Sequence, residues 1–249
     1  MSDIYLFGVP GVAMVLVSLI AVVTCRQMSG AAFKWFWAGA ALWTVAVALK
    51  VVFALLANQA VVRLLNHVLP PLLFLPAVGL YVGAVSAAFE IGLTWLVGRR
   101  WKFMGRDPSR AIAVGVGAGS LEALLLGVAT LAPWLAAAAG DDIREDREYL
   151  LAHAGATPLF WLVQPTGRLI ALLGHVSTRA LVLLGIADQR RGMVIGGFAI
   201  FALVDGTAEL LRLTQVSAGR SMWWISAATM PFNLIGIAVL VWYLRQRRR

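Results

Sequence analysis

The stretch AIAVGVGAGSLEALLLGVATLAPWL, residues 111–135, is predominantly apolar and contains a single ionisable side chain, that of Glu122. It exceeds the roughly 20 consecutive apolar residues that an α-helix needs to cross the hydrocarbon core of a bilayer. Its early glycines, Gly115, Gly117 and Gly119, are the small residues that let transmembrane helices approach one another closely. The stretch therefore predicts a membrane-spanning helix with an acid near its middle.

The composition extends this prediction to the whole chain. The 249 residues are 61% hydrophobic and 13% charged, with a mean hydropathy of +0.83, whereas soluble domains are about half apolar and about a quarter charged. Together with 111–135, the apolar stretches predict seven spans: 4–25, 32–57, 71–98, 111–135, 160–186, 192–213 and 223–244. We therefore expect an all-α polytopic membrane bundle that forms a single domain over residues 1–249.

The basic residues sit at the ends of the predicted spans. They gather in the segments 98–106, 189–191 and 245–249, and the net charge is +9. With seven spans these segments fall on one side, which the positive-inside rule assigns to the cytoplasm. The sequence thus predicts a multi-pass protein of the cytoplasmic (inner) membrane, with its N-terminus outside and its C-terminus inside. Little soluble mass is left to bind a nucleic acid, so the expected partner is the lipid bilayer.

Two further features of the sequence limit the possible structures and sites. The acidic segment 137–157 predicts a short surface helix on the outer side. The single cysteine, Cys25, excludes an internal disulfide and a cysteine-cluster metal site.

Ionisable residues inside a span cost at least a few kcal/mol, so they usually face a partner or a cavity. Eight of the ionisable residues in the predicted spans are candidates for such a role: Lys50, Glu90, Glu122, Arg168, His175, Arg179, Asp205 and Glu209. Glu90, Glu122, His175 and Asp205 lie 8 to 13 residues from the inner ends of four different spans, which is roughly 12–20 Å along a helix. We therefore expect them to share one polar layer.

Spacing indicates how this layer is built. Arg168, His175 and Arg179 are separated by seven and four residues, so they lie on one face of the fifth span. We expect that face to meet the acids of the third, fourth and sixth spans. Lys50 lies near the outer end of its predicted span, where it can extend to the interface. For Arg179 and Glu209, a purely structural ion pair is as reasonable an interpretation as a functional one.

Four segments of the predicted spans contain short motifs with these polar residues: LYVGAVSAAFEIGLTWLV (80–97), GVGAGSLEALLLG (115–127), GRLIALLGHVSTRALV (167–182) and FALVDG (201–206). They resemble, in this order, the patterns Phe-Glu-Glu-x-x-Arg, Gly-x-Gly-His-Gly-Gly-x-Glu-Ala, Glu-Arg-x(6)-His and His-x-x-x-Asp of the YhfC-type intramembrane metallopeptidase family. That family is distantly related to the CAAX prenyl-protease and bacteriocin-processing membrane proteases. The resemblance covers most of the chain, and the segment 37–50, WAGAALWTVAVALK, is similar to the family's second helix.

The resemblance implies peptide-bond hydrolysis near the membrane, with histidines and glutamates holding a divalent metal such as zinc or a water. The chain keeps five of the motif residues, namely Glu90, Glu122, Arg168, His175 and Asp205. Its departures from the patterns include Ile91, Thr94, Ala118, Gly167 and Phe201. Ala118 and Phe201 stand where the family has histidine, so His175 and Glu122 are the only ligand candidates left. One histidine with carboxylates is a poor zinc site.

The resemblance then assigns the roles as follows. Glu122 would be the general base, His175 its partner or a lone metal ligand, and Glu90 a further catalytic residue, while Arg168 and Asp205 would orient groups or bind a membrane-anchored peptide substrate. Two alternatives stay open, a non-catalytic relative that binds a membrane protein partner and a small transporter. The first is favoured by the missing histidines, and the second is weakened by the lack of an inverted repeat.

Overall fold

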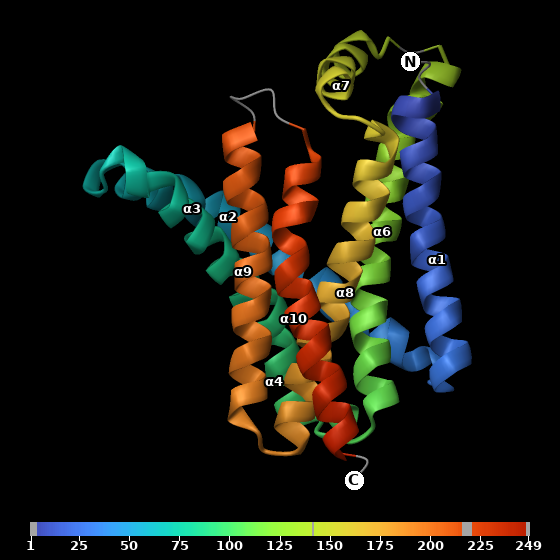
Figure 1. Ribbon diagram of the computed structural model, residues 1–249, viewed down its shortest axis with the longest axis vertical. Coiled ribbons are helices and arrows are strands. Elements are labelled where there is room, and N and C mark those ends of the chain that lie inside the picture. Colours follow the sequence, from blue (N-terminus) through green and yellow to red (C-terminus); the bar gives the residue numbers. More distant parts are fainter. Residues whose placement is uncertain (1–3, 141, 216–220, 248–249) are drawn as a thin grey trace.

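The computed structural model describes residues 4–140, 142–215 and 221–247, and every regular element among them is a helix. Seven helical segments are long and apolar enough to cross a membrane: Leu6–Ser29, Phe33–Val68, Pro71–Arg100, Pro108–Ala138, Phe160–Ala187, Arg191–Thr214 and Trp223–Arg247. All seven predicted spans are therefore confirmed, and they form the upright bundle of Figure 1.

The helices are η1 (Ile4–Gly8), α1 (Val9–Ser29), α2 (Phe33–Val68), α3 (Pro71–Ser86), η2 (Ala87–Ile91), α4 (Gly92–Arg100), α5 (Phe103–Arg106), α6 (Pro108–Ala138), α7 (Arg144–Ala156), α8 (Phe160–Ala187), α9 (Arg191–Gln215) and α10 (Trp223–Arg247). The two η elements are π-helical turns. Three of these elements, α3, η2 and α4, follow one another without a break and together make the third span. Helix α7 confirms the surface helix predicted within residues 137–157.

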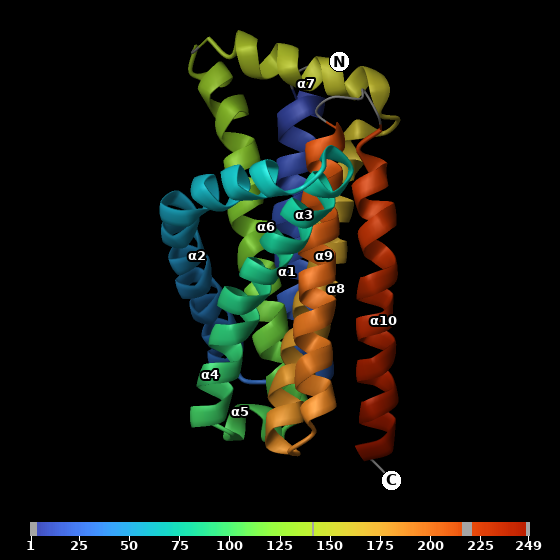
Figure 2. The ribbon, with the colours of Figure 1, turned by 90° about the vertical axis from the view of Figure 1, so that its left-hand side faces the viewer.

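The second span differs from its prediction. Helix α2 continues to Val68, past the predicted end at residue 57. The apolar run stops at Asn58 and Gln59, but the helix does not, because no glycine or proline interrupts the chain before Pro70. Figure 2 shows that the last turns of α2 change direction and run across the bundle to α3.

Helix α8 forms the centre of the bundle. It packs against α6, α9 and α10, and α6 in turn packs against α1 and α2. In α8 the run Ala180–Leu184 is almost completely buried on all sides, as expected for a helix that is surrounded by other helices rather than by lipid. The residues of the polar layer on α8 are therefore held at the middle of the molecule.

The glycines of α6 set how closely it approaches its neighbours. A Cβ added at Gly117 would lie 2.0 Å from the carbonyl oxygen of Phe36 in α2, and one at Gly115 would lie 2.6 Å from the Cα of Val176 in α8. A Cβ at Gly119 would lie 3.2 Å from the His175 side chain. The predicted close approach is confirmed, and it brings Glu122, one turn further along α6, against α8.

The two ends of the bundle differ in charge. Elements η1 and α7 contact each other at one end, whereas the described C-terminus, α4 and α5 lie at the other (Figures 1 and 2). The basic segments at 98–106, 189–191 and 245–247 all belong to this second end; Arg248 and Arg249 lie outside the described residues. The bundle thus has one basic end, as predicted, and the assignment of that end to the cytoplasm stays a prediction.

Replacing Gly117 with alanine should destabilise the protein by about 1–3 kcal/mol, because the new methyl group meets backbone rather than a movable side chain. The matched control is Gly196→Ala, where an added Cβ has no neighbour within 4 Å and the change should stay within about 1 kcal/mol. Equilibrium unfolding in detergent micelles measures both. Equal stability of the two variants would show that the α2–α6 contact is looser than described.

Candidate functional site

A cavity of about 560 Å³ lies inside the bundle, lined by residues of α2, η2, α6, α8, α9 and α10. Its walls fall within residues 122–129 of α6, 167–178 of α8, 201–208 of α9 and 225–233 of α10. Given the direction in which each helix runs, all four walls lead from the polar layer toward the end of the bundle that carries α7 (Figure 1). The cavity therefore extends away from the basic end.

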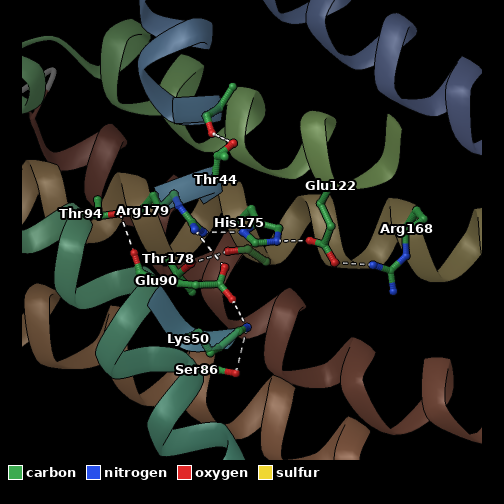
Figure 3. Close-up of polar contacts among 12 residues, drawn as sticks. Thr44, Lys50, Ser86, Glu90, Thr94, Glu122, Arg168, His175, Thr178 and Arg179 are labelled. Atoms are coloured by element: carbon green, nitrogen blue, oxygen red, sulfur yellow. Dashed lines mark hydrogen bonds and ion pairs between the residues drawn. The ribbon is translucent and has the colours of Figure 1, made fainter. Parts of the chain in front are cut away.

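Glu122 lies on the cavity wall between two residues of α8. Its Oε1 accepts a hydrogen bond from Arg168 Nη1 at 2.5 Å, and its Oε2 lies 2.5 Å from His175 Nε2 (Figure 3). Arg168 and His175 are two helical turns apart on the same face of α8, so a single carboxylate reaches both. The expectation that the face of α8 carrying Arg168 and His175 meets the acid of the fourth span is confirmed, and Glu122 and His175 both line the cavity.

Arg179 occupies the least accessible part of the site. Its side chain is 0% exposed; Nη1 contacts His175 Nδ1, and Nη2 donates to Glu90 Oε2 at 3.2 Å (Figure 3). The Phe201 ring packs edge-on against His175, and its centroid lies 5.6 Å from the guanidinium carbon. Arg179 thus links the imidazole of α8 to the carboxylate of the third span.

Glu90 sits in η2, a single π-helical turn within the third span. Such turns insert one extra residue into a helix, and they occur frequently at functional sites. Nothing in the local sequence AAFEI distinguishes it from an ordinary helical turn. The turn is visible only in the structure.

The expectation for Lys50 was wrong. Instead of extending to the outer interface, its Nζ lies 2.6 Å from Glu90 Oε1 and 3.3 Å from Ser86 Oγ. The reason is the true length of α2. Because the helix continues to Val68, Lys50 lies near its middle rather than near its outer end, and a buried carboxylate on the neighbouring span is within reach.

Asp205 and Glu209 have separate environments. Asp205 lines the cavity, and it lies near Ser86 of α3 and within electrostatic range of Lys50 and Arg179. Glu209 pairs with Arg212 at 2.8 Å on its own helix, and the Arg212 side chain is 64% exposed. The Glu209 pair is therefore a surface feature, whereas Asp205 belongs to the polar layer.

Asn233 of α10 is a cavity residue that the sequence analysis missed. It is 1% exposed, its Nδ2 donates to the Thr229 carbonyl at 3.1 Å, and its buried Oδ1 has no hydrogen-bond partner among the described residues. A Cβ at position 174 would lie 2.3 Å from that oxygen, so Gly174 is what makes room for the amide. A search restricted to ionisable residues passes over a neutral amide.

The formal charges of the site balance. Three cations, those of Lys50, Arg168 and Arg179, stand against the three carboxylates of Glu90, Glu122 and Asp205. Buried charges in a low-dielectric interior are retained when each one is paired and hydrogen-bonded. The layer as a whole is therefore electrically neutral when His175 is neutral.

The fold and the site define the protein as a seven-helix membrane protein with a charged cavity between its spans. Residues 13–226 match the model of the YhfC intramembrane metalloprotease family, and because the match covers most of the chain, the chain belongs to that family. No curated protein and no solved structure matches it. The resemblance inferred from the motifs is thereby confirmed.

The residues of this site do not fit the metal ion that the family's description implies. Zinc in a hydrolytic site takes about three protein ligands, and no group of three or more His, Cys, Asp or Glu side chains within the described part of the chain is arranged to hold a metal. Both ring nitrogens of His175 and both oxygens of Glu122 are engaged with protein groups. A dication would also add two uncompensated positive charges to a neutral layer.

Removal of the Glu90 charge should be costly. Glu90→Gln leaves Lys50 and Arg179 without their carboxylate and should lower the free energy of unfolding by about 3–5 kcal/mol, as for other broken buried pairs. Glu209→Gln breaks a pair with an exposed partner and should cost about 1 kcal/mol or less. Unfolding in the same detergent compares them, and equal losses would contradict the buried pairing of Glu90.

Proposed function

We propose that the protein hydrolyses a peptide bond of a membrane-associated substrate within the cavity, without a metal ion, and that Glu122 is the general base. The observation that supports this is the meeting of Glu122 and His175 on the cavity wall at 2.5 Å. A carboxylate within reach of a water and of the scissile carbonyl is the arrangement that general-base hydrolysis requires. Membership of an intramembrane metalloprotease family supports the hydrolysis of a peptide bond, and the metal-free route rests on the residues of this site.

The resting ion pair explains how the base becomes available. Arg168 is 26% exposed in its side chain, whereas His175 is 6% exposed, so Arg168 is the partner of Glu122 that is free to move into the cavity. When a substrate carbonyl oxygen recruits the guanidinium, Glu122 loses one of its two donors and accepts a proton more readily. The same guanidinium then faces the oxygen on which negative charge develops.

The proposed step is balanced in its atoms. Glu122 takes a proton from water, the resulting hydroxide attacks the carbonyl carbon, and Arg168 stabilises the oxyanion. When the C–N bond breaks, the leaving amine receives the proton that Glu122 holds. Glu90 anchors Lys50 and Arg179 rather than reacting itself, and Asp205 faces the cavity as a group that orients substrate.

The position of the cavity indicates which side the substrate comes from. The cavity extends toward the end that carries α7, opposite the basic end, and the positive-inside rule places the basic end in the cytoplasm. The scissile bond would therefore lie in the outer half of the inner membrane. Other functions expected from the sequence, binding of a membrane protein partner and transport, lack a comparable observation.

Membrane topology can be measured directly. A reporter that is active only in the cytoplasm should work when fused after residue 249 and fail when fused before residue 1, because the seven spans place the termini on opposite sides. A periplasmic reporter should behave in the opposite way. The reverse pattern would move the cavity opening to the cytoplasmic side.

Cleavage can be sought without knowing the substrate. Membranes from cells that express the wild type, Glu122→Gln or the surface control Glu209→Gln are compared by sequencing of protein termini. New termini should appear with the wild type and the control, disappear with Glu122→Gln, and persist in vitro when a strong metal chelator is added. Loss of cleavage with the chelator would overturn the metal-free mechanism, and cleavage by Glu122→Gln would overturn the choice of base. An absence of new termini with the wild type would favour the non-catalytic interpretation.

A further inference from the structure

Both ring nitrogens of His175 are held by neighbours with known hydrogen-bonding character. On one side Nδ1 contacts Arg179 Nη1, and on the other Nε2 lies 2.5 Å from Glu122 Oε2 (Figure 3). The imidazole is 6% exposed, so water has little access to it. The protein partners therefore decide where its proton lies.

The partner of Nδ1 determines which ring nitrogen of His175 carries the hydrogen. A guanidinium has only donors and stays protonated in proteins, so Nδ1 must accept and carries no hydrogen. The hydrogen of the neutral ring is then on Nε2, where Glu122, a carboxylate, can only accept it. Arg179 therefore donates a hydrogen bond to His175, and His175 donates one to Glu122.

The surroundings of Arg179 keep it in this place. Glu90 accepts from its other terminal nitrogen at 3.2 Å, and the Phe201 ring flanks both the guanidinium and the imidazole. On the opposite helix, Gly119 offers no Cβ, and one placed there would come within 3.2 Å of the His175 ring carbon Cδ2. The ring is therefore confined by Phe201 and Gly119, and its hydrogen bonds have fixed directions.

We propose that Arg179 is a positioning residue that takes the place of a metal ion beside His175 and fixes the orientation and tautomer of that imidazole. Its guanidinium lies between a histidine and a glutamate, supplies the positive charge between them, and holds His175 as the Nε2–H tautomer directed at Glu122. His175 is then a hydrogen-bond donor, neither a base nor a metal ligand. The inference concerns the resting protein, so it stands whether or not the proposed hydrolysis occurs.

The tautomer is measured by ¹⁵N NMR of histidine-labelled protein in detergent micelles. The chain has 3 histidines, and the resonances missing from His175→Gln identify those of His175. We expect an unprotonated Nδ1 and a protonated Nε2 at neutral pH. A protonated Nδ1, either as the other tautomer or as the imidazolium, would overturn the proposal.

A substitution tests whether the guanidinium is the cause. In Arg179→Met the ¹⁵N signals of His175 should no longer show a single tautomer, because Nδ1 has lost the donor that keeps it unprotonated. The control Arg212→Met, at the surface of α9, should leave the His175 spectrum unchanged. An unchanged spectrum in folded Arg179→Met would overturn the assignment of Arg179. If Arg179→Met does not fold, the spectrum of the wild type still decides the proposal.

Metal content gives an independent readout. Arg179→His would put a third ligand beside His175 Nδ1 and Glu90, so it should retain zinc after dialysis, whereas the wild type and the control Arg212→His should not. Stoichiometric zinc in the wild type that is lost in His175→Gln would contradict the proposal. Neither this measurement nor the NMR spectrum depends on peptide cleavage, so failure of the proposed hydrolysis and failure of this inference can be told apart.

Discussion

The ion pair between Arg179 and Glu90 is the interaction on which the other parts of the molecule depend. A charge buried in a membrane-spanning bundle must have a partner of opposite charge, and each of these two residues provides it for the other. Arg179 is 0% exposed and Glu90 is 4% exposed in its side chain, so both charges are almost completely shielded from solvent and from the headgroup region. Each therefore requires the other. Lys50 and His175 join through the same pair, which ties α2, the third span and α8 together at one depth.

The glycines of α6 make this arrangement geometrically feasible. Close contact of α6 with α2 on one side and α8 on the other leaves Glu122 within 2.5 Å of two α8 side chains. Gly174 does the same for Asn233 on α10. In a bilayer, helices associate by packing and hydrogen bonding rather than by burial of apolar surface from water, so these small residues contribute directly to how the site is assembled.

The description of the family implies a metal ion, yet this member carries a guanidinium, that of Arg179, between His175 and Glu90. Phe201 stands at a motif position for histidine and packs against His175 and Arg179. The replacement is chemically consistent, because a neutral set of three cations and three carboxylates has no need of a dication.

The sequence by itself determined the class of the protein, its seven spans and the depth of its polar layer. These follow from the length of apolar runs and from helical periodicity, which are local properties of the chain. It also predicted that Arg168, His175 and Glu122 converge, because residues on one helix face must meet the same neighbour. Only the tertiary structure decided the partner of Lys50, the π-helical turn at Glu90, the role of Asn233 and the absence of a fitting metal site among the described residues. These four features depend on how far α2 extends and on how closely the helices approach one another. Distances between segments that are remote in sequence are set by packing and not by local composition.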